Sequence, residues 1–337
     1  MTDEIDFQIY GGDGQQVSVR DRSLPLFEKS EDLDHPRHYV AEEGLRNAVN
    51  VALALGQPLF ITGEPGTGKT QLAHSIAYEL ELPTKDQPAP LVFNTKTTST
   101  ASDLFYRYDA LAHFHDSQFR KDEQITASPY IKYEALGRAI LSSMKEGDPN
   151  RDLVDDLKGK PPARSVVLID EIDKAPRDLP NDVLNEIENM SFRVKETGVT
   201  FSADQRYRPI LVLSSNSEKN LPDAFLRRCV FYHISFPSST RLKEIVSRRI
   251  KPSPGFTDAM INNAITHFEE IRALGLTKPP ATAEFLAWLR ILEKKKLDVK
   301  NLRPGEQVAL TFTYSILAKN KEDKDRLDTL LVTGRTS

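Results

Sequence analysis

The chain contains the stretch Gly63-Glu64-Pro65-Gly66-Thr67-Gly68-Lys69-Thr70, which fits the phosphate-binding pattern G-x-x-x-x-G-K-[ST]. An apolar run at residues 58–61 precedes it and predicts a buried strand, and apolar residues recur at helical spacing over residues 72–80 after it. Because a strand, a glycine loop and a helix in this order are the context that the pattern requires, we favour a P-loop over a chance match in a glycine-rich turn.

The residue types of this loop suit a bound nucleotide. Glycines let successive backbone N–H groups turn towards a polyphosphate, and the following helix N-terminus adds partial positive charge. Lys69 can reach the β- and γ-phosphates, and the Thr70 hydroxyl can bind Mg²⁺. We predict that the quoted stretch and the adjoining Gln71 bind the nucleotide.

Composition limits the class of protein. The 337 residues suggest about two domains. Hydrophobic residues at 39% and charged residues at 28% are ordinary for a soluble globular protein, and the net charge of −4 argues against nucleic-acid binding. The single cysteine, Cys229, cannot form an internal disulfide, and no apolar stretch approaches the length of roughly 18 residues that a membrane span needs. The N-terminus is acidic and unlike a signal peptide, so we expect a cytoplasmic protein without membrane insertion.

Strands and helices alternate over the first two thirds of the chain. Apolar runs predict buried strands at 91–93, 165–169, 210–213 and 230–234, whereas helical spacing predicts helices at 41–55, 101–112, 131–144 and 180–190. This alternation is typical of an α/β fold with a parallel sheet. Two further short runs, at 192–194 and 199–201, flank a turn and predict a hairpin.

The pattern changes to helices alone after Pro237, at 240–252, 257–275, 282–296 and 305–331. We therefore predict three parts: an N-terminal arm or small hairpin at 1–36, an α/β core at 37–238, and a helical domain with a tail at 239–337.

Polar residues follow two of the predicted strands. Asp170 and Glu171 end the run at 165–169, which we expect to lie next to the P-loop strand and to present Asp170 to Mg²⁺. Glu171 is then the candidate to orient and deprotonate the attacking water, and Asn216, after the run at 210–213, can hydrogen-bond that water. The alternative is that these polar residues are solvated strand ends.

Two arginines, Arg227 and Arg228, end a short predicted helix at 221–228. An arginine presented to the γ-phosphate of a neighbouring subunit stabilises the charge of the transition state. The alternative is that the two cations complement the dipole of their own helix.

The order of these motifs resembles that of AAA+ ATPases, and within them the chain is similar to the MoxR family, through the hairpin at 192–201 and the Asn216 strand that follows it. The resemblance covers roughly residues 37–300. It implies a three-layer αβα core with a C-terminal helical lid.

By position, the resemblance implies Thr70 and Asp170 as Mg²⁺ ligands, Glu171 as the catalytic base and Asn216 as the first sensor. It implies Arg228 as the arginine that acts on the neighbouring subunit's nucleotide, with Arg227 as a second candidate. His38, Tyr39 and Val40 lie where the family packs the adenine, and Asn94 is a candidate to hold Glu171 inactive. The second-sensor arginine of the family is missing, because residues 277–282 read TKPPAT.

The resemblance also implies ATP and Mg²⁺ as cofactors, and a homo-oligomeric ring, expected to be a hexamer, that remodels or activates a client protein in a chaperone-like role. MoxR relatives act with a partner that contains a von Willebrand factor A domain, so we expect such a partner. A nucleotide-gated switch or scaffold in bacterial defence or signalling, with slow hydrolysis, stays open as the alternative. A DNA-acting motor is disfavoured by the net charge of −4.

Two further patterns carry weaker signals. Residues 320–323 spell the guanine-binding signature N-K-x-D, but they follow a helical run rather than a strand, so we expect a chance match. A group of aromatic residues at 105–119 could grip a threaded chain, although we expect ordinary core packing for its members, which are Phe105, Tyr106, Tyr108, Phe114 and Phe119.

Overall fold

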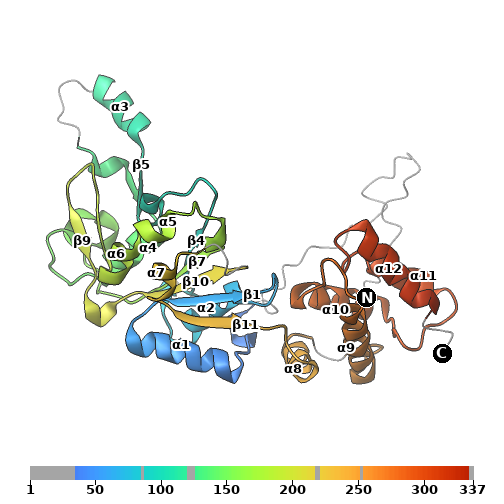
Figure 1. The fold of residues 1–337 in the computed structure, drawn as a ribbon. Helices are drawn as coiled ribbons and strands as arrows, with labels where there is room; N and C mark the ends of the chain where they lie inside the picture. Colours follow the sequence, from blue (N-terminus) through green and yellow to red (C-terminus); the bar gives the residue numbers. More distant parts are fainter. Residues whose placement is uncertain (1–34, 85–86, 120–125, 217–220, 251–252, 334–337) are drawn as a thin grey trace. The chain divides into compact units, whose positions relative to one another are not determined.

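The computed structural model describes residues 35–84, 87–119, 126–216, 221–250 and 253–333 (Figure 1). The chain divides into two compact units. One unit comprises Tyr39–Ser235. The other combines the residues from Phe236 onward with the short 3-10 helix η1 (Pro36–His38), which precedes the first unit in the chain. The arm or hairpin that we expect at residues 1–36 lies outside the described residues, except for its last two.

The first unit is built on a five-stranded sheet in the order β11-β1-β10-β7-β4, in which every neighbouring pair is parallel. The strands are β1 (Leu59–Gly63), β4 (Leu91–Asn94), β7 (Val166–Asp170), β10 (Ile210–Ser215) and β11 (Val230–Ile234). All five coincide with the strands that the apolar runs predict. The expected burial is wrong for β11, where Ile234 alone is buried and Phe231 is 48% exposed, and holds for only alternate residues of β4. The prediction of a parallel α/β sheet is therefore confirmed.

Helices cover both faces of this sheet, because successive strand side chains point to opposite faces. Val166 and Leu168 pack in one apolar core, while Val167 and Ile169 pack in the other. The first core contains residues of two helices, α1 (Glu43–Leu55) and α2 (Lys69–Glu79). The second contains residues of four helices, α4 (Ala135–Ser143), α5 (Leu179–Asp182), α6 (Leu184–Asn189) and α7 (Asp223–Leu226). This arrangement confirms the three-layer αβα core.

Short strands pair outside the main sheet as β2–β3, β5–β6 and β8–β9. Their bounds are Pro83–Thr84, Gln87–Pro88, Tyr106–Tyr108, Ile131–Tyr133, Ser191–Arg193 and Thr200–Ser202. Single 3-10 turns are η2 (Ala101–Leu104), η3 (Ser128–Tyr130), η4 (Arg151–Leu153), η5 (Asp155–Leu157), η6 (Ile172–Lys174) and η7 (Gln205–Tyr207). The β8–β9 pair confirms the predicted hairpin at 192–201, with Phe192 opposite Phe201.

The predicted helix at 101–112 is wrong, and the predicted helix at 131–144 begins too early. Strand β5 interrupts the first, and strand β6 occupies the start of the second, so that α4 begins only at Ala135. The Tyr106 hydroxyl accepts a hydrogen bond from the backbone N–H of Lys195, 3.0 Å away. Contacts between segments distant in sequence therefore override the local helical pattern here.

Two other predicted helices are each divided in two. The helix expected at 180–190 breaks at Val183, whose φ of −101° and ψ of 2° are not helical and whose side chain is buried in the core. The helix expected at 305–331 consists of α11 (Glu306–Thr313) and α12 (Lys321–Thr333). Buried Tyr314 follows α11, and its hydroxyl contacts His267.

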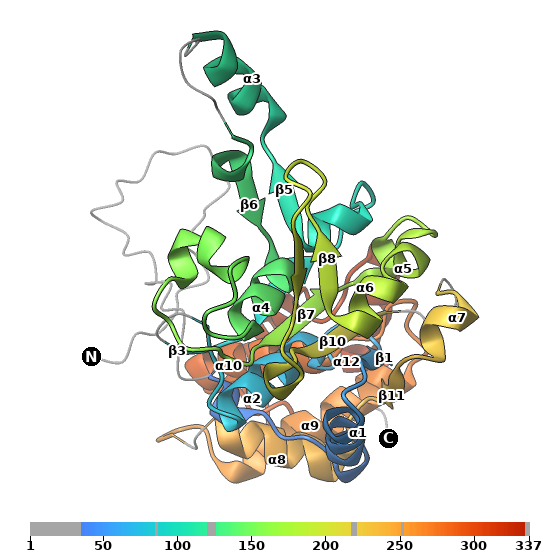
Figure 2. The same ribbon diagram turned by 90° about the vertical axis from the view of Figure 1, so that its left-hand side faces the viewer.

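A projecting segment of β5, α3 (Ala110–Phe119) and β6 extends from the α/β core, with α3 at its far end (Figures 1 and 2). The prediction that these aromatic residues pack in the core is confirmed for Phe105 and Tyr106, which are buried, and Tyr108 packs partly against the same core. The prediction is wrong for Phe114 and Phe119, whose side chains are 63% and 76% exposed.

The second unit is helical, as the sequence predicts. Besides α11 and α12 it contains α8 (Ser239–Arg249), α9 (Asp258–Ala273) and α10 (Thr282–Lys295). Its core is centred on Phe268, Phe285 and Trp288, which are fully buried. None of the helices in the described ranges is long and apolar enough to cross a membrane.

The N-K-x-D pattern has a structural role in this unit. Asp323 is fully buried and accepts hydrogen bonds from the backbone N–H groups of Thr277 (2.8 Å) and Lys278 (3.0 Å), and from the side-chain amide of Asn320 (2.7 Å). The pattern thus fastens the start of α12 to the loop that contains Thr277 and Lys278.

We expect Asp323→Ala to lower the thermal midpoint by roughly 5 to 10 °C, because two backbone N–H groups lose their acceptor. Burial opposes the charge, but the hydrogen bonds from Thr277, Lys278 and Asn320 outweigh it and hold the pKa of Asp323 below its ordinary value. The stabilisation is therefore complete at neutral pH and is lost as the pH falls below about 4, through the lowered pKa. Thermal melts at pH 7 and pH 3 measure this, with the exposed Asp325→Ala as the control. Equal thermal midpoints of the Asp323→Ala and Asp325→Ala variants at pH 7 would contradict this stabilising role of Asp323.

Candidate active site

The P-loop follows β1 and leads directly into α2. Gly63 adopts φ 151°, and a Cβ added there would lie 2.5 Å from the backbone oxygen of Ile234. Gly68 adopts φ 92° at the N-cap of α2, next to the ring of Tyr39. Side chains cannot be accommodated at these two positions without strain, so the glycines allow the backbone to turn. The strand, glycine loop and helix therefore follow one another in the order that the sequence predicts.

Lys69 lies inside this loop and is only 7% exposed. Its ammonium group donates hydrogen bonds to the carbonyl oxygens of Gly63 (2.8 Å) and Glu64 (3.0 Å). Burial lowers the pKa of Lys69, although the nearby carboxylates of Asp170, Asp173, Glu171 and Glu64 act in the opposite direction. The geometry thus keeps a desolvated cation at the loop, suited to interact with a phosphate.

Thr70 and Asp170 come together although they are a hundred residues apart. The Thr70 hydroxyl donates to Asp170 Oδ2 at 3.0 Å, and the Ser214 hydroxyl donates to Asp170 Oδ1. The same Ser214 oxygen accepts the backbone N–H of Glu171 at 3.0 Å. Hydroxyl and carboxylate oxygens are the ligand types that Mg²⁺ prefers, and this cation is commonly held by one or two carboxylates together with phosphates. These residues therefore fit a Mg²⁺–nucleotide complex.

Ser214 is the residue of this cluster that the sequence analysis missed. It is fully buried in β10, where it bridges Asp170 and Glu171. The available signal was the polar pair Ser214-Ser215 at the end of an otherwise apolar strand. Such a serine is easily passed over because its partners come from another strand.

Strand β10 also corrects the expected position of the acidic strand. Strand β7, which carries Asp170, is not next to β1, because β10 lies between them. Asn216 directly follows β10 and thus lies at the centre of the carboxyl edge, where its backbone N–H approaches Asp173 Oδ1 at 3.4 Å. Its side chain is exposed. Ligands of open α/β sheets bind at this edge.

Glu171 has a left-handed backbone conformation, with φ 55°, directly after β7. Its carboxylate forms an ion pair with Lys174. Asn94, the proposed restraint on Glu171, pairs in register with Asp170, but the contact that the structure gives the Glu171 carboxylate is Lys174. The hydrogen bond with Glu171 raises the pKa of Lys174.

Of the predicted adenine residues, the structure places Tyr39 beside the P-loop, whereas His38 belongs to the other unit. The ring of Tyr39 would be 3.2 Å from a Cβ added to Gly68, so it packs against the end of the P-loop. Val40 follows it and is half-buried, and Gln71 is half-buried in the first turn of α2.

Arg227 and Arg228 lie at the opposite edge of the sheet. Cys229 alone separates Arg228 from β11, whose first residue, Val230, pairs in register with Leu59, the first residue of β1. A strand rises about 3.3 Å per residue, so the length of β1 separates this edge from the P-loop by roughly 13 Å. The structure therefore does not bring either arginine to the Lys69 site of the same chain.

A match to a protein-family profile shows the family of this chain. A search of curated proteins found no match. Among solved structures, the crystal structure of the FIGL-1 AAA domain in complex with ADP matches with a TM-score of 0.41 and 14% identity, over 86% of this chain and 87% of that one. A sequence profile of the AAA domain, dynein-related subfamily, matches residues 58–229. Since these residues make up more than half of the chain, the protein belongs to the AAA domain family.

Proposed function

We propose that this chain hydrolyses ATP at a site completed by a second copy of itself. The observation that carries the proposal is the separation of the two edges of the sheet. Lys69, Thr70 and Asp170 cluster at the carboxyl edge, whereas Arg228 lies at the amino edge. Because one chain cannot join them, an arginine that acts on the γ-phosphate must come from a neighbour. Membership of the AAA family supports ATPase activity and ring-shaped assembly in general.

Each residue of the carboxyl edge has a role in this proposal. Lys69 and the P-loop N–H groups bind the phosphates, while Thr70 and Asp170 hold Mg²⁺, which neutralises phosphate charge when bound. Glu171 accepts a proton from the attacking water, and Asn216 orients that water. The Ser214 hydroxyl fixes the orientation of the Asp170 carboxylate.

For the biological role we propose a MoxR-like remodeller that acts on a client protein as a ring, expected to be a hexamer. The exposed apolar side chains of α3, among them Leu111 and Phe114, support a protein client because they offer an unpaired surface. A von Willebrand factor A-domain partner and a cytoplasmic location remain expectations from the resemblance.

A shared site predicts that activity depends on assembly. We expect the ATPase rate per subunit to rise with protein concentration until the ring is saturated, because a lone chain lacks the arginine contribution. Steady-state hydrolysis over a dilution series, with sedimentation of the same samples, measures this. A rate per subunit that stays constant while the oligomers dissociate would contradict the shared site.

The alternative function is a nucleotide-gated switch or scaffold with slow hydrolysis. The observation that favours it is the ion pair between Glu171 and Lys174, which occupies the proposed base. Assembly that follows ATP binding with little turnover supports the switch, whereas turnover stimulated by a client supports the remodeller.

A further inference from the structure

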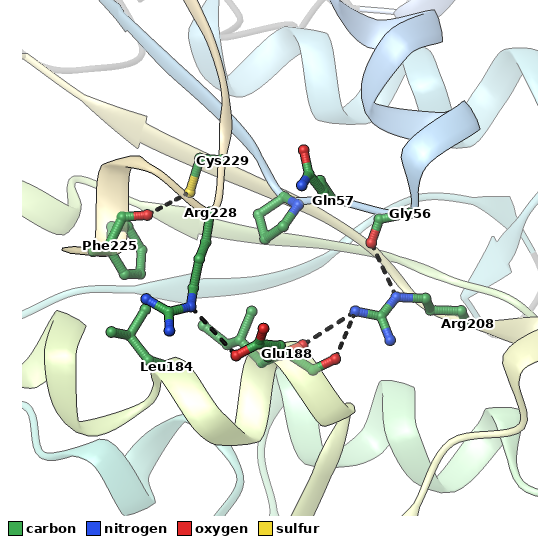
Figure 3. Close-up of a pocket in the computed structure, with 10 residues that line it drawn as sticks. Gly56, Gln57, Leu184, Glu188, Arg208, Phe225, Arg228 and Cys229 are labelled. Atoms are coloured by element: carbon green, nitrogen blue, oxygen red, sulfur yellow. Dashed lines mark hydrogen bonds and ion pairs between the residues drawn. The ribbon is translucent and has the colours of Figure 1, made fainter. Parts of the chain in front are cut away.

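A carboxylate holds the guanidinium of Arg228 in place. Its Nε donates to Glu188 Oε2 at 3.3 Å, and one of its terminal nitrogens donates to the backbone oxygen of Ala224 at 2.9 Å. Glu188 belongs to α6, whereas Ala224 belongs to α7, one turn before the arginine. In Figure 3 the Glu188 side chain lies between those of Arg228 and Arg208.

These two contacts use only part of the hydrogen-bonding capacity of the arginine. A guanidinium carries five N–H groups in a rigid planar fork. With Nε and one terminal nitrogen engaged by the chain itself, the described residues leave the N–H groups of the other terminal nitrogen available. Because the fork is rigid, fixing two of its nitrogens fixes the direction of the third.

Arg208 in turn fixes the backbone that carries Glu188. Its guanidinium donates to the carbonyl oxygens of Ile187 (3.3 Å) and Glu188 (3.1 Å) at the end of α6, and to that of Gly56 (3.0 Å) after α1. Arg208, Glu188 and Arg228 line one pocket (Figure 3). Apolar side chains, among them those of Leu184 and Phe225, line it as well. Glu188 is therefore anchored through its main chain while its carboxylate stays free to bind Arg228.

We propose that Glu188 is a positioning residue, which orients Arg228 towards the γ-phosphate bound by a neighbouring chain; this inference rests on the proposed function. The pair is exposed, at 45% for Arg228 and 60% for Glu188, so it contributes little to the free energy of folding. Exposure also leaves it accessible to a second copy. The ion pair with Glu188 restricts the Arg228 side chain before the phosphate binds. Less conformational entropy is then lost when the arginine contacts the phosphate.

The test compares Glu188→Ala and Glu188→Gln with Arg228→Ala in the assembled protein. We expect Glu188→Ala to lower kcat roughly tenfold with KM for ATP unchanged, because the nucleotide site itself is intact. Glu188→Gln should keep most of the activity, since its amide oxygen still accepts the Nε–H bond. In the Arg228→Ala background, Glu188→Ala should cause no further loss of residual activity.

The exposed Asp182→Ala, on the neighbouring helix α5, serves as the matched control, and thermal melts verify folding. Three results would overturn the inference. The first is a Glu188→Ala variant with the activity of this control, and the second is an equal loss of kcat from Glu188→Ala in the Arg228→Ala background. The third is a Glu188→Gln variant that loses as much activity as Glu188→Ala. In all three cases a collapse in Arg228→Ala leaves the shared site standing. An Arg228→Ala protein with full activity would instead refute the proposed function itself.

Discussion

Lys69→Met is expected to abolish detectable ATP hydrolysis and to weaken ATP binding by at least about a hundredfold, because the loop loses its phosphate-binding cation. The same change should leave the thermal midpoint of the nucleotide-free protein unchanged or higher. Burial lowers the pKa of Lys69, which means that folding disfavours its charged form, and an uncharged side chain avoids that cost.

The measurements are ATP titration by calorimetry, steady-state hydrolysis and thermal melts of the nucleotide-free protein. The exposed Lys145→Ala, on the surface of the same unit, is the control for the loss of one positive charge. Normal ATP binding by Lys69→Met would contradict the assigned role. A lowered midpoint would show that the carbonyl oxygens of Gly63 and Glu64 depend on the ammonium group for the stability of the loop.

Arg228→Ala is expected to lower kcat by about a thousandfold with ATP binding retained, because an arginine supplied from a neighbour is worth that much in phosphoryl transfer. Mixing provides the sharper experiment. In an equal mixture of Arg228→Ala and Lys69→Met chains, about a quarter of the head-to-tail interfaces combine an intact Lys69 with an intact Arg228. We therefore expect activity to reappear on mixing two inactive proteins.

Arg227→Ala decides between the two arginines. Both arginines are exposed, but Glu188 and Ala224 hold the guanidinium of Arg228, so we expect the larger loss at Arg228. The exposed Arg138→Ala, on α4, is the control. Two inactive proteins that stay inactive when mixed, although they form joint oligomers, would contradict a site shared between chains.

The sequence predicted the elements whose pattern is local and strong. The five strands were found from their apolar runs. The runs are continuous and buried in the central strands β1, β10 and β7, because a parallel sheet covered on both faces requires this, whereas the edge strands β11 and β4 are only partly buried. The P-loop was found because its glycine positions meet a steric requirement that few other residues satisfy, as at Gly63 and Gly68. The helices failed where tertiary contacts compete with local preference, as at Tyr106, whose strand pairs with residues 131–133.

The sequence by itself therefore determined the class of fold, the phosphate loop and the identity of the two acids at the end of β7, because these depend on residue type and short-range spacing. Only the tertiary structure decided which strands lie side by side and which distant side chains come into contact. It placed β10 between β1 and β7, brought Ser214 to Asp170, and put Arg228 beside Glu188 at the edge opposite Lys69. Strand order and register bring together side chains that are far apart in the chain, and no local pattern encodes those pairings.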